Sequence, residues 1–525
     1  MSTNAKEYSW VLAASVFILA LSSIPIIAGY ASQTPAQHFI GTFSDRQDYP
    51  VYIATMQYGE QGNWDYQFRF TTEAQPVVYL RTFYVVLGHL MGWTGLSPAL
   101  IFQLARIIFG LLACLAIYRL MSRVFATIRQ KRLAFVLAIL GAGFGWFQAP
   151  LHLVPNPGIS PIDLWLIDAY VFFSIAVFPH FSAVIAALAF SMSVFLDHME
   201  TPRWRNIALI AICAVFVQIV NPIAFVLADC AMLGTFIFSC WSKHKFNWTV
   251  ALALCLIAVI QVPILIYSLA LLSHDPVWAE YNRQSVTSSP PPIYYLMGFG
   301  LLWPFAAIGA VRALRKPAAS MGWAVVWVVV AIGMAFLPVD IQRRFLIAIG
   351  IPLATLATPV MITFSEWLHR RLPISEMTGA LIVGAMMIMT PVLMVSAFSV
   401  DMMNQPTDFF EPTALFDAAD WLNKNGTSQQ VVLAAEPTAQ LIAMRTPLKL
   451  YFGHAMETLF YAEKSQAVAN FYQGKQPANW LDMQGITWVI FGPHEKMWRE
   501  QPPDFPNLKI SYQNELVIIY RVISP

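Results

Sequence analysis

The sequence predicts a mainly α-helical membrane protein: a polytopic helical bundle followed by a small α/β domain. Of its 525 residues, 58% are hydrophobic and only 11% are charged, whereas soluble domains carry roughly a quarter charged residues. Apolar runs long enough to cross a bilayer recur over residues 1–400 and stop before the tail, 401–525. We therefore expect a transmembrane domain at 1–400 and a soluble domain at 401–525.

The first domain contains about eleven candidate spans. The apolar runs cover residues 10–30, 98–118, 133–149, 178–196, 206–221, 222–241, 248–271, 294–311, 320–337, 344–364 and 377–399. The first run is longer than the apolar region of a signal peptide, and Lys6 beside Glu7 makes a poor basic leader, so we expect a retained span. Pro222 would interrupt a helix, so Asn221-Pro222 predicts a tight turn between two spans.

Basic residues gather in alternate connections and predict the orientation. "YRLMSRVFATIRQKR", "PRWR", "SKHK", "RALRKP" and "LHRR" all fall on one side of the membrane if the spans are counted in order. The positive-inside rule places that side and the N-terminus in the cytoplasm. We expect the protein in the plasma (inner) membrane. The first loop, 31–97, the loop 150–177 and the tail domain are then extracytoplasmic.

The tail has the alternating pattern of a small α/β domain. Helix-like segments at 416–425 and 456–474 alternate with β-type runs at 430–435 and 487–492, and a hairpin over 508–522 turns at Gln513-Asn514. All five cysteines lie in apolar runs, which argues against a disulfide framework or a cysteine metal site. No basic block is built for nucleic acid.

The first loop carries the most distinctive polar residues. Asp48 and Tyr52 are four residues apart and would share one face of a helix, and Asp45 precedes them. Gly62-Asn63-Trp64 and Glu73-Ala74-Gln75-Pro76 follow, and then an apolar, interrupted stretch that suits a helix lying on the membrane surface. The plain structural alternative is that Asp48 caps the helix that Pro50 begins.

These motifs resemble the first external loop of the GT-C superfamily of membrane glycosyltransferases, such as protein O-mannosyltransferases and lipid A aminoarabinose transferases. That family shows an acidic D-E-x-x-Y motif, a G-x-W and an E-x-P-type segment in this order. Here Tyr49 stands at the second acidic position, and Asp45 is the candidate substitute. Beyond the first 100 residues, the resemblance is one of architecture only.

The resemblance implies a GT-C-like bundle and a glycosyltransferase (EC 2.4) that uses a polyprenyl-phosphate sugar donor. The acceptor would be a lipid, a glycan or a protein on the external face, and membrane lipids would surround the bundle. It also implies that Asp48, supported by Asp45, is the general base that takes the acceptor proton. Tyr52 and Glu73 would then contact substrate, and the stereochemical outcome stays open.

Arg343 and Arg344 in "DIQRRF" are candidates to hold the phosphate of the donor. They lie at the outer end of a span, against the trend of the basic loops, and the planar guanidinium suits phosphate. The alternatives are interfacial snorkelling and an ion pair with Asp340.

The loop 150–177 offers a second group of polar residues. His152, Asp163 and Asp168, with His180 at the following membrane edge, are candidates to bind the acceptor. They could also hold a divalent metal, Mg²⁺ or Mn²⁺, but their spacing matches no metal signature, and we expect no required cofactor. A plain polar loop is the remaining alternative.

Two further pairs have a structural and a functional interpretation. Arg106 and Asp229 lie inside spans, and we expect a mutual ion pair because intramembrane charges usually find a partner. His454 and Glu457 in the tail could touch an acceptor, or simply cap the next helix.

A transporter or flippase of lipid-linked substrates is the main alternative function, together with a polymerase or ligase of lipid-linked glycans. Transporters commonly show internal repeats and polar groups at the bilayer midplane. This sequence has no detectable repeat, and its polar groups gather at the outer boundary, which favours the transferase. A sensory or structural protein would leave the loop acids and the arginine pair without a role.

Overall fold

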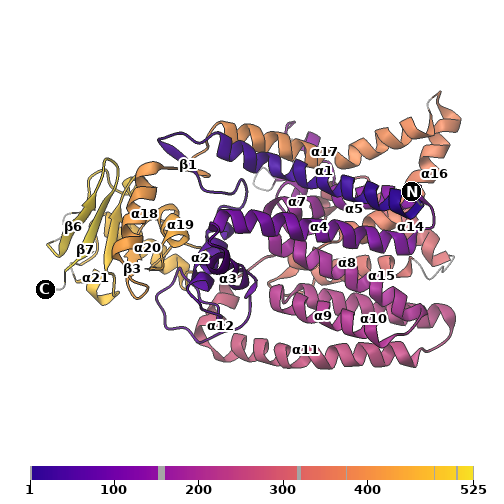
Figure 1. Cartoon of the computed structure of the whole chain (residues 1–525), viewed down its shortest axis with the longest axis horizontal. Coiled ribbons are helices and arrows are strands. Elements are labelled where there is room, and N and C mark those ends of the chain that lie inside the picture. The colour runs from indigo at the N-terminus through magenta and orange to yellow at the C-terminus, as the bar shows by residue number, and fades with distance from the viewer. Residues whose placement is uncertain are drawn as a thin grey trace. The chain divides into compact units, whose positions relative to one another are not determined.

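The computed structural model describes residues 3–151, 160–315, 321–373, 375–477, 479–503 and 506–523. The chain is mainly helical and has a small sheet near its C-terminal end (Figure 1). It divides into two compact units. The bundle unit comprises Met1–Ile24, Leu104–Ile266 and Val286–Phe398, and the tail unit comprises Pro25–Gln103, Tyr267–Ser285 and Ser399–Pro525. The predicted division at residue 400 stays a prediction.

Each of the eleven apolar runs contains a helix, and seven of the described helices are long and apolar enough to cross a membrane. These seven are α1 (Thr3–Ala31), α4 (Pro98–Val124), α8 (Pro179–Glu200), α10 (Ala224–Lys243), α11 (Trp248–His274), α16 (Gly350–Arg371) and α17 (Glu376–Met403). An eighth candidate span is the bent pair α13 (Pro292–Phe299) and α14 (Leu302–Arg315). The remaining runs form the shorter helices α5 (Ile128–Leu140), α9 (Trp204–Val220) and α15 (Gly322–Ala335). The chain is a multi-pass membrane protein.

Glycines explain why two runs are not single straight helices. The helix α5 ends at Leu140, before Gly143, where a Cβ atom would lie 2.1 Å from the carbonyl oxygen of Met297. The pair α13 and α14 bends by 91° around Gly300, whose φ of +49° favours glycine. The predicted turn at Asn221 is confirmed, because its side-chain oxygen accepts from the backbone N–H groups of Ile223 and Ala224.

Arg106 has partners other than the one we expected. Its guanidinium donates to the hydroxyl groups of Ser22 and Ser23 and to the carbonyl of Ile175. The expected ion pair with Asp229 is therefore wrong. The hydroxyls of Ser22 and Ser23 also donate to the carbonyl of Leu19 in their own helix. Because a serine hydroxyl can accept one hydrogen bond while it donates another, the buried arginine is hydrogen-bonded without a carboxylate.

The first loop forms two crossed helices in the tail unit, α2 (Asp48–Glu60) and α3 (Phe83–Thr94). Their backbones touch, because a Cβ on Gly59 would lie 2.2 Å from the oxygen of Val85, and one on Gly88 would lie 2.0 Å from that of Met56. Before them, β1 (Gln37–Phe39) pairs antiparallel with β2 (Phe410–Pro412). The loop is thereby tied to the tail by main-chain hydrogen bonds.

The predicted α/β pattern of the tail is confirmed. Five strands have the order β4-β3-β5-β7-β6, with β3 parallel to β4 and β5, and β7 antiparallel to β5 and β6. Their bounds are β3 Val431–Leu433, β4 Lys449–Leu450, β5 Trp488–Phe491, β6 Leu508–Gln513 and β7 Ile518–Val522. The helices α18 (Thr413–Asn425), α19 (Glu436–Arg445) and α20 (Tyr461–Tyr472) accompany them.

Candidate active site

Asp48 is the first residue of α2, and the residue before it, Gln47, makes no side-chain capping bond. The backbone N–H of Asp48 donates to Oδ1 of Asp45 at 3.2 Å, and Asp45 has a left-handed φ of +51°. Because Asp48 lies inside the helix and Gln47 precedes it, the interpretation of Asp48 as the cap is wrong. Asp45 instead holds the turn that leads into α2.

Tyr52 lies one turn after Asp48 on the same face of α2, as the spacing predicts. Its hydroxyl donates to Oδ2 of Asp48 at 3.4 Å. Its ring stacks on Tyr84 of α3, with centroids 4.1 Å apart and planes inclined by 13°. Tyr52 is therefore fixed by packing and orients one oxygen of the carboxylate.

His454 approaches the other oxygen of Asp48. Its Nε2 lies 3.3 Å from Oδ1 of Asp48, while its Nδ1 accepts from the backbone N–H groups of Met456 at 3.2 Å and Glu457 at 3.0 Å. Because Nδ1 accepts twice, the ring proton belongs on Nε2, and His454 donates to Asp48. The histidine side chain is 5% exposed, but that of Asp48 is 39% exposed, so the carboxylate keeps an accessible side.

The turn that carries His454 is held by a helix from another part of the chain. The amide of Gln284, in α12 (Pro276–Gln284), donates to the carbonyls of Met456 at 2.7 Å and Thr458 at 2.8 Å. The hydroxyl of Thr458 accepts from the backbone N–H groups of Gly453 and His454. The imidazole is thus positioned by a rigid turn.

Arg81 is the main residue that the sequence did not reveal. Its guanidinium carbon lies 5.4 Å from the ring centre of Tyr66 and 5.1 Å from that of Tyr281. Its Nη1 is buried and has no hydrogen-bond partner among the described residues. A cation held by two aromatic rings with an unused N–H is a ready site for an anion.

Glu457 places a buried carboxyl beside the same tyrosine. It accepts a hydrogen bond from the hydroxyl of Tyr66. Burial raises the pKa of Glu457, and the neighbouring His454, Arg81 and Tyr66 oppose this rise. His454 and Glu457 were expected either to touch an acceptor or to cap a helix. The structure places them in a connected polar cluster with Asp48 and Arg81.

Glu73 connects the first loop to the helix α20 of the tail. It forms an ion pair with Lys464 of α20, at 2.8 Å, and it also accepts from the hydroxyl of Thr71. That hydroxyl accepts from the backbone N–H of Leu459. Glu73 therefore braces the loop against the turn that carries His454.

Arg343 and Arg344 lie in the bundle unit, in the short helix η3 (Gln342–Leu346). The guanidinium carbon of Arg343 is 4.9 Å from the ring centre of Trp165. Both arginines face Asp168. Burial raises the pKa of Asp168 to about 6, and the charges of Arg344 and Arg343 oppose this rise. These three residues form a second polar group.

Asp163 is held by hydrogen bonds within the bundle unit, and His180 packs on an aromatic ring. Asp163 accepts from the backbone N–H groups of Gly143 and Gly145 and from the hydroxyl of Thr390 at 2.8 Å. Burial raises its pKa to about 6, and these hydrogen bonds lower it. The ring of His180 packs on that of Phe181, with centroids 4.1 Å apart.

The expected metal alternative has no support in the described chain. His152 lies outside the described residues. Among the residues that the structure describes, no group of three His, Cys, Asp or Glu side chains is arranged to hold a metal ion. The roles of Arg343, Arg344, Asp163, Asp168 and His180 in substrate binding stay predictions.

The whole fold is similar to three kinds of membrane glycosyltransferase. The oligosaccharyltransferase of Archaeoglobus fulgidus matches with a TM-score of 0.53 and 13% identity, over 92% of this chain and 69% of that one. ArnT from Cupriavidus metallidurans, solved with undecaprenyl phosphate, matches with a TM-score of 0.53 and 11% identity, over 98% of this chain and 100% of that one. The arabinofuranosyltransferase AftD from Mycobacteria matches with a TM-score of 0.55 and 14% identity, over 97% of this chain but 40% of that one.

The chain therefore has a GT-C-like fold, as its first-loop motifs led us to expect. No protein-family model and no curated protein sequence matches it. At these identities, the likeness establishes the architecture, and the chemistry must be argued from the site itself.

Proposed function

We propose that this chain is a membrane glycosyltransferase that moves a sugar from a polyprenyl-phosphate donor to a lipid, glycan or protein acceptor. The single observation that carries the proposal is the accessible carboxylate of Asp48, held by Tyr52 and His454 in the tail unit. The GT-C-like fold supports the reaction class. ArnT, a structure with the same architecture, was solved with undecaprenyl phosphate bound, which supports a polyprenyl-phosphate carrier.

Asp48 acts as the general base in this proposal. The acceptor oxygen attacks the anomeric carbon, its proton passes to Asp48, and the bond between the anomeric carbon and the phosphate oxygen breaks. Free polyprenyl phosphate is the leaving group. A carboxylate with both oxygens oriented but one side open can receive that proton within hydrogen-bond reach.

Arg81 binds the departing phosphate. Its charge is fixed by the rings of Tyr66 and Tyr281, and its Nη1 is available for a phosphate oxygen. The charge that develops on the leaving phosphate is stabilised by such a preorganised cation. Arg343 and Arg344 remain the alternative phosphate ligands, and substitution separates the two possibilities.

The active face is extracytoplasmic in this proposal. The basic connections predict a cytoplasmic N-terminus, which places the first loop and the tail outside. The donor would be presented from the outer leaflet, and the acceptor would reach Asp48 from the aqueous side.

The experiment follows release of free polyprenyl phosphate by purified full-length protein from a panel of polyprenyl-phosphate sugars, with lipid extract as the acceptor source. Wild type is compared with Asp48→Asn. The matched control is Glu60→Gln, which removes an exposed acid from the other end of the same helix. We expect release with one donor, loss of release in Asp48→Asn and normal release in Glu60→Gln.

Equal release by Asp48→Asn and wild type would overturn Asp48 as the base. Movement of an intact lipid-linked sugar across a proteoliposome membrane, without release of the phosphate, would overturn the transferase in favour of a flippase.

A further inference from the structure

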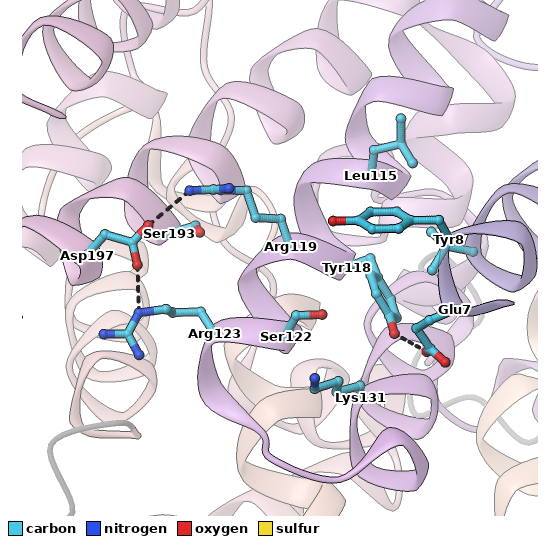
Figure 2. Close-up of a pocket in the computed structure, with 11 residues that line it drawn as sticks. Glu7, Tyr8, Leu115, Tyr118, Arg119, Ser122, Arg123, Lys131, Ser193 and Asp197 are labelled. Atoms are coloured by element: carbon cyan, nitrogen blue, oxygen red, sulfur yellow. Dashed lines mark hydrogen bonds and ion pairs between the residues drawn. The ribbon is translucent and has the colours of Figure 1, made fainter. Parts of the chain in front are cut away.

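The bundle unit contains a cavity of about 620 Å³ at one end of four helices (Figure 2). Its walls come from the start of α1, the end of α4, the start of α5 and the end of α8. Arg119 is 21 residues along α4 from Pro98, so it lies roughly 32 Å from the start of that helix. The polar residues that line the cavity include Glu7, Arg119, Arg123, Lys131, Ser193 and Asp197.

Most charges around the cavity are paired, but they leave donors available. Arg119 and Arg123 both bond to Asp197, at 2.9 and 2.7 Å, on one side of the view in Figure 2. On the other side of the view, Glu7 accepts a hydrogen bond from the hydroxyl of Tyr118. Glu7 also forms an ion pair with Arg132 at 2.8 Å. The side chain of Lys131 forms no ion pair or hydrogen bond within the described chain, although its charge interacts with that of Glu7. The side chain of Arg119 is 49% exposed, so its guanidinium can donate to a further anionic partner.

Ser193 is a second, independent observation that points to a ligand. The residue is 1% exposed and lines the cavity, yet its hydroxyl has no hydrogen-bond partner among the described residues. A buried hydroxyl without a partner carries a desolvation cost. An acceptor oxygen in the cavity would remove that cost.

An apolar groove of about 430 Å³ adjoins the cavity and shares Leu115 and Arg119 with it. Its other walls include Phe109, Phe190 and Phe216. The polar cavity and the apolar groove meet at Arg119. The cavity suits the headgroup of a lipid, and the groove suits its hydrocarbon chain.

We propose that this site binds an anionic phospholipid, with its phosphate at Lys131 and Arg119 and one acyl chain along the groove. Three basic side chains against two acidic ones line the cavity, so an anion is favoured over a neutral headgroup. The basic loop 119–132 belongs to the connections that the positive-inside rule places in the cytoplasm, where anionic lipids attract such segments. The proposal concerns a separate site and does not depend on the proposed transferase.

The experiment measures lipid binding to the full-length protein in a neutral detergent, by native mass spectrometry and by thermal stabilisation. The probes are phosphatidylglycerol, phosphatidylcholine and free glycerol phosphate. Lys131→Gln removes one cation from the cavity wall, and Leu115→Trp fills the junction of cavity and groove. The matched control is Lys245→Gln, an exposed lysine in another basic connection that does not line the cavity.

We expect phosphatidylglycerol to bind and to stabilise the wild type more than phosphatidylcholine does. Lys131→Gln should weaken its binding about fivefold, the effect of losing one basic contact, and Lys245→Gln should not. Leu115→Trp should weaken the lipid more than it weakens glycerol phosphate. Equal binding of the two lipids, equal effects of the two lysine substitutions, or equal stabilisation by glycerol phosphate would each overturn the proposal.

Discussion

Asp48 and Asp163 are both hydrogen-bonded carboxylates in segments between apolar helices, yet their surroundings differ in one decisive respect. Asp163 is 1% exposed, and its partners are two backbone N–H groups and Thr390. Asp48 is 39% exposed and is held by the side chains of Tyr52 and His454. Hydrogen bonding alone therefore does not distinguish the two carboxylates. The proposal of Asp48 as the general base rests on its orientation together with its accessible side.

The largest effect should appear when Asp48→Asn and Asp163→Asn are compared for activity. We expect Asp48→Asn to lower kcat about 10³-fold, since general-base catalysis is worth roughly 10²–10⁴-fold. Asp163→Asn should retain kcat per folded molecule within about twofold if its role is structural, because its side chain is almost fully buried. The measurement is release of polyprenyl phosphate under saturating donor, normalised to folded protein.

Stability should show the opposite pattern. Asp163→Ala leaves buried N–H groups of Gly143 and Gly145 without an acceptor, so we expect a loss of about 3 kcal/mol. Thermal unfolding in detergent measures it, with Asp340→Ala as the control because Asp340 is an exposed acid of the same unit. Equal loss of stability in Asp48→Ala would remove the distinction between the two carboxylates.

The comparison also shows how far the sequence could be interpreted. The spacing of Asp48 and Tyr52 is local, so helical periodicity predicted their shared face. The partnership of Asp48 with His454 spans 406 residues and leaves no local pattern. Arg81 lies inside an apolar stretch, and only the folded turn brings it between Tyr66 and Tyr281.

In the bundle unit, the positions of the helices could be predicted, but the break at Gly300 and the contacts between helices could not. Composition alone predicted the eleven helical runs, because apolar length is what a bilayer selects. The break at Gly300 depends on a backbone conformation that hydropathy does not encode. The pairing of Arg106 with serine hydroxyls could not be predicted either, because it requires knowing which helices touch.

Substituting Arg81 and Arg344 in separate variants tests which of them holds the phosphate of the donor. We expect Arg81→Gln to raise the donor KM about 30-fold, the loss of one charge-assisted bond in a partly dry site. Arg344→Gln should change it less than threefold. Steady-state kinetics across donor concentrations measure both, and the reverse order would transfer the phosphate role to the bundle unit.

His454 should act as a positioning residue through Asp48. We expect His454→Ala to lower kcat about 10-fold with little change in KM, because the carboxylate loses one orienting donor. His454→Gln should recover part of kcat, since its amide can donate to the same oxygen. A structural role alone would lower the amount of folded protein and leave no difference in kcat between the two variants.

The smallest effect concerns Asp168, whose buried carboxyl has a pKa of about 6 against a usual value of 3.8. Between those pH values, the folded chain holds a proton that the unfolded chain releases, so this residue makes stability fall as pH rises through the window. Asp168→Asn should flatten the dependence of Tm on pH between about 4 and 6 by a few degrees, whereas Asp340→Asn should leave it unchanged. If the slope survives in Asp168→Asn, the arginines beside Asp168 keep its carboxylate ionised, and they are then less free to bind a phosphate.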